Sequence, residues 1–275
     1  MSASLAWLEI ADRVFVKRYE FYDQNIGVIL GDEAALVIDT RVSQRQAAET
    51  IADIREVTPR PVRVVVNTHG HSDHAFGNRE FRPAEIWGHE RCVRMIETTG
   101  DRQRAAVASA IPGLAPELAE VVLDPPDRTF ADTATVEVEP GGRSVELVYL
   151  GRGHTDNDIV VRLTDANVLF AGDLLEADAT PFFGDGFPLD WPVTVERLVE
   201  LATDDVVVVP GHGTIGDRGF AISQMTEFRE IAELARLVHR GVLGIDAAVL
   251  RTPYPADTAL EPLTRALAQL RGELD

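Results

Sequence analysis

Three histidines and an aspartate fall within six residues of this chain, in the segment HGHSDH at residues 69–74. The segment directly follows a run of valines that is typical of a buried strand. Side chains at positions i and i+2 of an extended loop point the same way. His69 and His71 can therefore hold one metal ion, while Asp73 and His74 point toward a second. Imidazole and carboxylate ligands together favour zinc, and they also accommodate iron or manganese.

Three more candidate ligands follow other strand-like runs. His154 lies in a glycine-containing turn, Asp173 stands at the end of an apolar strand, and His212 follows a second valine run. Their small neighbours allow the backbone and an ion to approach closely. Each of these residues alone is more often a core or surface residue than a ligand, and only their combination with the first segment points to a metal centre. His89 and His239 match no such pattern and are interpreted as non-ligands.

Alternating strands and helices are predicted to position these residues. Strands are expected over 13–19, 26–30, 35–38, 62–66, 135–138, 145–150, 159–163, 168–171 and 206–209. Helices are expected over 43–57, most of 90–122, a segment after Pro192, 222–238 and 259–270. Within 90–122 we expect breaks near Gly100 and at residues 111–113. Two valine strands each deliver a histidine from their C-terminal end, which indicates two similar halves, each with a sheet, that face each other.

The composition excludes several classes of function. The 275 residues carry a formal charge of −19, from 26 Lys and Arg against 45 Asp and Glu, which argues against a nucleic-acid partner or an anionic membrane. No run of roughly 18 apolar residues predicts a transmembrane helix. The N-terminal residues lack the features of a signal peptide, so we expect a cytoplasmic protein. Cys92 is the only cysteine, so neither an internal disulfide nor a multi-cysteine metal site can form.

The order of these motifs resembles that of the metallo-β-lactamase superfamily. HxHxDH at 69–74 is followed by Gly-His-Thr at 153–155, Gly-Asp at 172–173 and Gly-His at 211–212. The resemblance extends from Val14 to about Gly219. It implies an α/β fold of the αββα sandwich type, with a metal site at one edge of the two sheets. We therefore expect a single domain over residues 1–275, with the sandwich core in about 1–218 and a helical C-terminal part in about 219–275.

The resemblance also implies a role for each ligand. The first metal would be held by His69, His71 and His154. The second metal would be held by Asp73, His74 and His212, and the two would be bridged by Asp173. This implies two zinc ions per chain and a shared hydroxide that acts as a nucleophile at neutral pH. Asp73 would orient that hydroxide and later deliver a proton to the leaving group.

Segments 153–161 and 209–219 look similar to zinc β-lactamases, but other positions depart from them. Where those enzymes have a cysteine ligand this chain has Asp173, and where they grip the substrate carboxylate with a lysine it has Glu176. His74 also fills a position that they usually give to a non-ligand. The ligand set is instead that of glyoxalase II, lactonases and many general hydrolases. We expect a hydrolase of lactones, esters or thioesters, and only weak turnover of β-lactams, whose carboxylate Glu176 would repel.

Other residues are predicted to support the site. Asp39 ends an apolar strand and is expected to orient a ligand histidine, although a turn-capping role fits its position equally well. Tyr22 and three aromatic residues after Asp173 could shape a pocket for an apolar substrate. These three are Phe183, Phe187 and Trp191. The alternative for the aromatic residues is packing beneath a long loop.

Alternative functions on the same fold differ in the metal that they use. A persulfide dioxygenase-like oxidoreductase with one iron fits the ligand pattern, and we retain it as the alternative to the hydrolase. A flavodiiron protein is disfavoured, because it would normally have a glutamate at His71 and a flavin domain. A nuclease is disfavoured by the charge, and a non-catalytic binding protein by the complete ligand set. We expect a small-molecule substrate as the partner, and the helical tail leaves a homodimer open.

Overall fold

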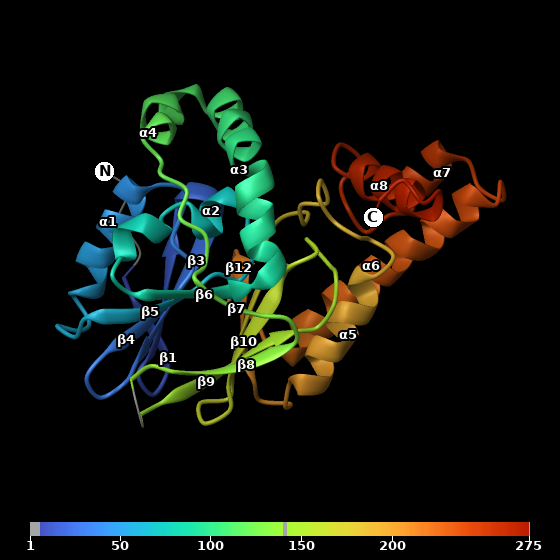
Figure 1. Ribbon diagram of the computed structural model, residues 1–275. Coiled ribbons are helices and arrows are strands. Elements are labelled where there is room, and N and C mark those ends of the chain that lie inside the picture. The colour runs from blue at the N-terminus through green and yellow to red at the C-terminus, as the bar shows by residue number, and fades with distance from the viewer. Residues whose placement is uncertain (1–5, 140–141, 275) are drawn as a thin grey trace.

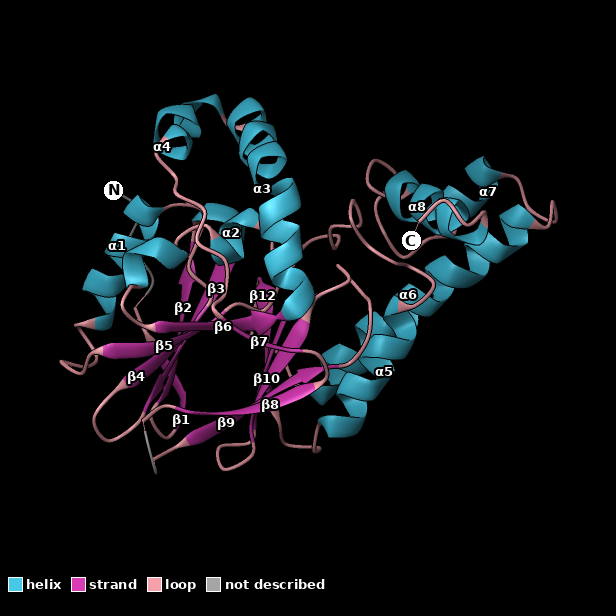
Figure 2. Ribbon diagram, in the orientation of Figure 1, coloured by secondary structure: helices cyan, strands magenta, loops and turns pink. Residues whose placement is uncertain are grey.

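Two halves of a mixed β-sheet pack face to face, and helices cover the two outer faces (Figures 1 and 2). The computed structural model describes residues 6–139 and 142–274. The halves meet along one edge, where His212 of one half pairs with Gln24 of the other. This arrangement is the αββα sandwich that the motifs predicted.

The first half contains the N-terminal strands and the helices that cover them. Its strands are β1 (Leu8–Ala11), β2 (Val14–Tyr19), β3 (Gln24–Leu30), β4 (Ala35–Ile38), β5 (Val62–Val66), β6 (Glu85–His89) and β7 (Arg128–Phe130). Its helices are α1 (Gln44–Ile54), α2 (Ser72–Ala75), α3 (Glu90–Ala110) and α4 (Ala115–Ala119), with short 3₁₀ turns at Phe21–Asp23, Asn78–Phe81 and Pro112–Leu114. Strands β4 to β7 are parallel, so their C-terminal ends reach the same edge of the sheet.

The second half contains the remaining strands and the C-terminal helices. Its strands are β8 (Thr133–Glu137), β9 (Ser144–Tyr149), β10 (Ile159–Leu163), β11 (Val168–Glu176) and β12 (Val207–His212). Its helices are α5 (Trp191–Leu201), α6 (Arg218–His239), α7 (Ile245–Val249) and α8 (Leu260–Leu270). Strands β11 and β12 are parallel, and the other pairs in this half are antiparallel.

Successive side chains of these strands point into two different buried layers, which explains why the strands are continuous apolar runs in the sequence. In β3 and β4, Ile29 and Leu36 point into the layer between the two halves, whereas Val28 and Val37 point outward toward α1. Both faces of each strand are therefore buried, which removes the polar alternation of a half-exposed sheet. The same holds for β10, where Val161 faces the inner layer.

Most of the predicted helices and strands are present, and several begin or end at the residues that the sequence indicated. Ser43 caps α1, with its side chain accepting a hydrogen bond from the Gln46 amide. The predicted break at residues 111–113 is observed, but the predicted break near Gly100 is wrong, because α3 runs unbroken from Glu90 to Ala110. A Cβ at Gly100 would lie 2.6 Å from Cδ1 of Leu123, so this glycine permits close packing instead of ending a helix.

The C-terminal helices extend the second half. Met225 and Phe228 of α6 pack with Trp191 of α5 on the outer face of β10 to β12. The second part of α6 continues past the sheet, and α7 and α8 pack against it (Figure 1). Among the described residues, no helix combines the length and apolar character needed to cross a membrane.

Candidate metal centre

The predicted ligands gather where strands of both halves end at the same edge. His69 and His71 lie in the loop between β5 and α2, and Asp73 and His74 lie in α2 itself. The second half contributes His154 from the loop after β9, Asp173 from within β11, and His212 from the last residue of β12. The two halves of the sandwich thus contribute side chains to one centre.

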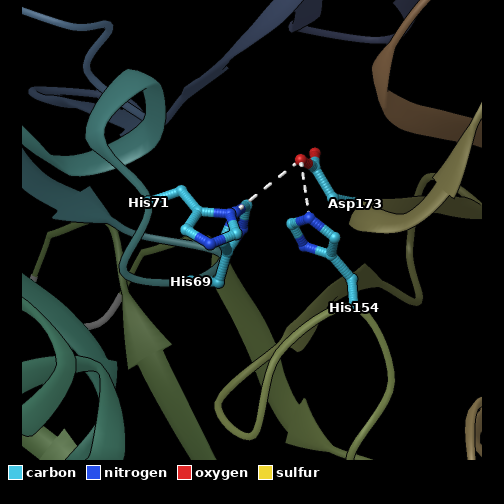
Figure 3. Close-up of side chains that lie close together, drawn as sticks. All are labelled: His69, His71, His154 and Asp173. Carbon is cyan, nitrogen blue, oxygen red and sulfur yellow. Dashed lines mark ion pairs between the residues drawn. The ribbon is translucent and has the colours of Figure 1, made fainter. Parts of the chain in front are cut away.

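The first group combines three histidines with one carboxylate (Figure 3). One ligand atom each from His69, His71, His154 and Asp173 lie within 4.8 Å of one another. The Nε2 atoms of His69 and His154 lie 3.7 and 3.8 Å from Oδ2 of Asp173. Three imidazoles and a carboxylate facing a common point form a typical zinc donor set.

The second group lies beside the first and shares a neighbour with it. Asp73, His74 and His212 also place one ligand atom each within 4.8 Å of the others. Oδ2 of Asp73 lies 3.3 Å from Nε2 of both histidines. The two oxygens of Asp173 approach the same histidines, at 3.4 Å from His74 and 3.3 Å from His212. Asp173 therefore contacts both groups.

Several buried polar atoms of these groups have no hydrogen-bond partner in the described part of the chain. They are Nε2 of His69, both ring nitrogens of His154 and Oδ1 of Asp173. Leaving a buried donor or acceptor unpaired costs about 1–3 kcal/mol per group. A metal ion between imidazole nitrogens and carboxylate oxygens would satisfy these atoms, so the residues fit a metal.

Electrostatics at the centre also favour a cation. Burial opposes the charged form of His74, but the carboxylates of Asp173 and Asp73 outweigh it and hold the pKa of His74 well above its ordinary value. Burial would raise the pKa of Asp173, yet nearby His74 and His212 hold it well below the usual range. The carboxylates thus create a potential that stabilises positive charge, whether a proton or a metal ion.

A cavity of about 600 Å³ opens over both groups. Its lining includes the predicted Tyr22, which is 39% exposed, and Phe182, which is 48% exposed. Phe183 and Trp191 were predicted to line the pocket, but both are fully buried in the core beneath α6. Phe187 is also buried and does not line this cavity. The prediction is wrong because the side chain of Phe183 packs in the core, whereas that of its neighbour Phe182 faces the cavity.

A family comparison adds independent information on this centre. The model of the metallo-beta-lactamase superfamily matches residues 19–212. This chain belongs to the metallo-β-lactamase superfamily. The matched range holds every residue of both groups, which confirms the family that the motifs predicted.

Individual members of the superfamily are similar over most of their length. The metallo-beta-lactamase type 2 of Bacillus cereus is 26% identical over 201 residues, covering 71% of this chain and 70% of that protein. The hydroxyacylglutathione hydrolase of Gloeobacter violaceus is 26% identical over 220 residues, covering 76% and 75%. Among solved structures, a metallo-beta-lactamase from Pontibacter korlensis aligns with a TM-score of 0.63 at 24% identity, covering 82% of this chain and 99% of that one. This last similarity shows the shared fold.

Asp39 lies directly behind the second group of this superfamily centre. Its carboxylate accepts hydrogen bonds from the amide and the hydroxyl of Thr68, each at 2.8 Å, and lies 2.8 Å from Nδ1 of His74. On the other side, Nδ1 of His212 donates to the carbonyl of Tyr22 at 2.7 Å. With Nδ1 engaged in both rings, Nε2 is the nitrogen that faces the group.

Two carboxylates near the first group were not identified from the sequence. Asp158 accepts hydrogen bonds from the amide and hydroxyl of Thr155, and its Oδ1 lies 3.6 Å from Nδ1 of His154. Asp185 places Oδ2 at 3.1 Å from Nε2 of His71. The available signals were the spacing of Asp158 four residues after a ligand histidine, and the two glycines that flank Asp185.

Glu176 also lines the cavity, three residues beyond Asp173. Burial, together with the nearby charge of Asp173, raises the pKa of Glu176 to about 7. Oε1 of this side chain accepts a hydrogen bond from the Phe182 amide at 2.9 Å. An acidic group therefore faces the cavity that a substrate would enter.

Proposed function

We propose that this protein is a dinuclear zinc-dependent hydrolase that cleaves an acyl bond in a small molecule, with lactones, esters and thioesters as the leading substrates. The observation that carries the proposal is the pair of adjacent His/Asp groups that share Asp173. Relatives named as a β-lactamase and as a hydroxyacylglutathione hydrolase support hydrolysis as the reaction class. β-Lactams are expected to be poor substrates, because their carboxylate would meet Glu176.

The two groups would hold one ion each. The first ion would be held by His69, His71, His154 and Asp173, and the second by Asp73, His74, His212 and Asp173. Bound zinc supplies Lewis acidity, which polarises a carbonyl and makes water acidic enough to attack at neutral pH. The unpaired nitrogens of His69 and His154 are the atoms that most require such an ion.

Asp73 is the residue we assign to proton transfer. Its carboxylate lines the cavity, where it can accept a proton from attacking water. As water adds to the acyl carbon and the bond to the leaving oxygen, sulfur or nitrogen breaks, Asp73 returns that proton to the leaving atom. The net result is a carboxylic acid and an alcohol, thiol or amine.

Proton release tests the proposal, because hydrolysis of each candidate substrate yields an acid. Zinc-loaded protein in weak buffer is mixed with a pool of lactones, esters, thioesters and β-lactams. We expect acid release that disappears in Asp73→Ala and persists in Asp205→Ala, which changes an exposed carboxylate outside the cavity lining. Equal release by Asp73→Ala, or no release by the unchanged chain, would contradict the proposal.

A mononuclear iron oxidoreductase of the persulfide dioxygenase type is the second candidate. The observation in its favour is the set of His69, His154 and Asp173, which matches the two-histidine, one-carboxylate pattern of non-haem iron oxygenases. Purified protein with one iron per chain and oxygen consumption on a persulfide would support this candidate. Oxygen consumption that is absent from iron-loaded protein would exclude it.

A further inference from the structure

The C-terminal helix α8 makes direct contacts with residues 182–190, a segment whose first residues form one side of the cavity. Nε of Arg265 donates to the carbonyl of Gly186 at 2.8 Å. One turn further along α8, Gln269 accepts a hydrogen bond from the Leu189 amide at 2.9 Å and donates to the Asp190 carboxylate at 3.0 Å. Residues four apart lie on one face of a helix, so α8 presents both side chains to the same segment.

That segment places an aromatic ring beside the first metal-binding group. The ring centroid of Phe182 lies 6.0 Å from those of His71 and His154. A Cβ at Gly184 would lie 2.3 Å from Cζ of Phe182, so the glycine lets the ring fold over the backbone. Asp185, the next residue, contacts His71. The contacts of α8 therefore fall just after the residues that shape the cavity.

The surroundings of Arg265 suit a structural role, in which its guanidinium joins α8 to Gly186. Its guanidinium lies 6.0 Å from the centre of the Phe187 ring, and burial lowers its pKa. Removing a guanidinium from water is costly unless its hydrogen bonds are replaced, and the Gly186 carbonyl supplies one of them. Arg265 does not line the cavity, so it acts on the site only through the segment.

Apart from the metal-binding residues, the cavity lining combines Phe182, Tyr22 and small apolar side chains with polar groups such as Arg102 and Gln103. The small residues are Ala106, Ala177 and Ala179. Ala106 comes from α3, whereas Ala177 and Ala179 follow β11. The apolar part of this lining, formed by Phe182, Tyr22 and the alanines, gains free energy by covering hydrocarbon.

We propose that Arg265 is a positioning residue, which holds Gly186 so that Phe182 forms the wall on which an apolar acyl group of the substrate packs. The inference rests on the proposed hydrolase function and adds the substrate class, namely acyl compounds with an extended apolar acyl group. Arg265 lies outside residues 19–212, the range that the family model matches. The positioning contact is therefore made by the C-terminal helices of this chain.

Chain-length dependence of ester hydrolysis tests the proposal. Zinc-loaded protein is assayed with 4-nitrophenyl esters from acetyl to octanoyl. We expect kcat/KM to rise roughly fourfold per methylene, the factor for burying one CH₂. Phe182→Ala and Arg265→Met should flatten this dependence and raise KM for the octanoyl ester about tenfold or more, a larger rise than for the acetyl ester. Arg265→Lys should restore part of the dependence, because lysine can donate to the same carbonyl.

Arg271→Met is the matched control, because Arg271 ends the same helix and pairs with Glu273 at the surface. It should leave the chain-length dependence unchanged. In metal-free protein, hydrogen exchange at the Gly186 and Phe187 amides should accelerate in Arg265→Met and remain slow in Arg271→Met. A steep dependence in Phe182→Ala, or unchanged exchange and KM in Arg265→Met, would overturn the inference.

Failure of the proposed function would be recognised separately. If the unchanged chain hydrolyses none of these esters and releases no acid from the pool of lactones, esters, thioesters and β-lactams, the hydrolase proposal fails. The apolar wall is then tested by calorimetric titration with octan-1-ol. Tighter binding by the unchanged chain and Arg271→Met than by Phe182→Ala and Arg265→Met would support the wall. Equal binding by all four proteins would overturn it.

Discussion

Replacing Asp39 with asparagine should weaken one zinc site and leave the other intact. In the structure the Asp39 carboxylate lies 2.8 Å from Nδ1 of His74, and neither side chain has more than 2% of its surface exposed. Asparagine keeps an oxygen that can accept from the Thr68 amide, so the local backbone should survive. What is lost is the negative charge behind His74, which makes its Nε2 a better donor to a metal.

The size of the effect follows from the contact. A hydrogen bond to a charged group in a buried site contributes about 1.5–3 kcal/mol. At 1.4 kcal/mol per decade this corresponds to a loss of roughly 10- to 150-fold in zinc affinity. Asp158 offers a graded comparison, because its Oδ1 lies 3.6 Å from Nδ1 of His154, beyond hydrogen-bond distance. Asp158→Asn should therefore weaken zinc binding by much less.

Competition with a chelator of known zinc affinity measures how tightly both variants bind zinc. In Asp39→Asn, one zinc equivalent should shift to weaker binding by this amount, while the other binds as in the unchanged chain. Equal weakening of both equivalents, no weakening at all, or a larger loss in Asp158→Asn would refute the reasoning. Circular dichroism of each variant separates loss of affinity from loss of fold.

Three further changes have defined outcomes. Burial lowers the pKa of His89, so the unfolded chain binds this proton more readily and the free energy of unfolding falls as pH drops through about 6.5. His89→Gln should reduce the acid sensitivity of the urea midpoint between about pH 7 and 5, and equal sensitivity would contradict this role. A Cβ at Gly211 would lie 1.8 Å from Oδ1 of Asp173, so Gly211→Ala should fold but bind fewer zinc ions by elemental analysis; full loading would be the opposite result. Phe183→Ala removes a fully buried ring packed on Trp191 and should lower the free energy of unfolding by about 3–5 kcal/mol in urea, where a loss below about 1 kcal/mol would contradict it.

The residues of the centre could be identified from the sequence because their signals are local. Each candidate ligand follows a run of apolar residues, and strand ends in such folds converge on one edge. The placement of Asp173 was less accurate, because β11 was expected to end at Ala171 and instead continues to Glu176. Gly172 has φ of +53° at a register shift, and this irregularity lets the strand continue through the site.

The cavity wall could not be predicted in the same way. Phe182 and Phe183 are identical neighbours, and which one faces the core depends on packing against Trp191 and Phe228. The contact with Phe228, like the hydrogen bond from Arg265 to Gly186, joins residues far apart in the sequence. The helix break predicted near Gly100 is wrong for the same reason, since Leu123, on which Gly100 packs, lies beyond the end of α3.

Anomalous diffraction from crystals grown with zinc tests the dinuclear centre most directly. Data collected at the zinc edge should show two peaks, one enclosed by the first group around His69 and one by the second group around His74, with Asp173 between them. A single peak in the first group, with an iron edge in protein purified without added metal, would contradict the dinuclear zinc centre and favour the iron enzyme.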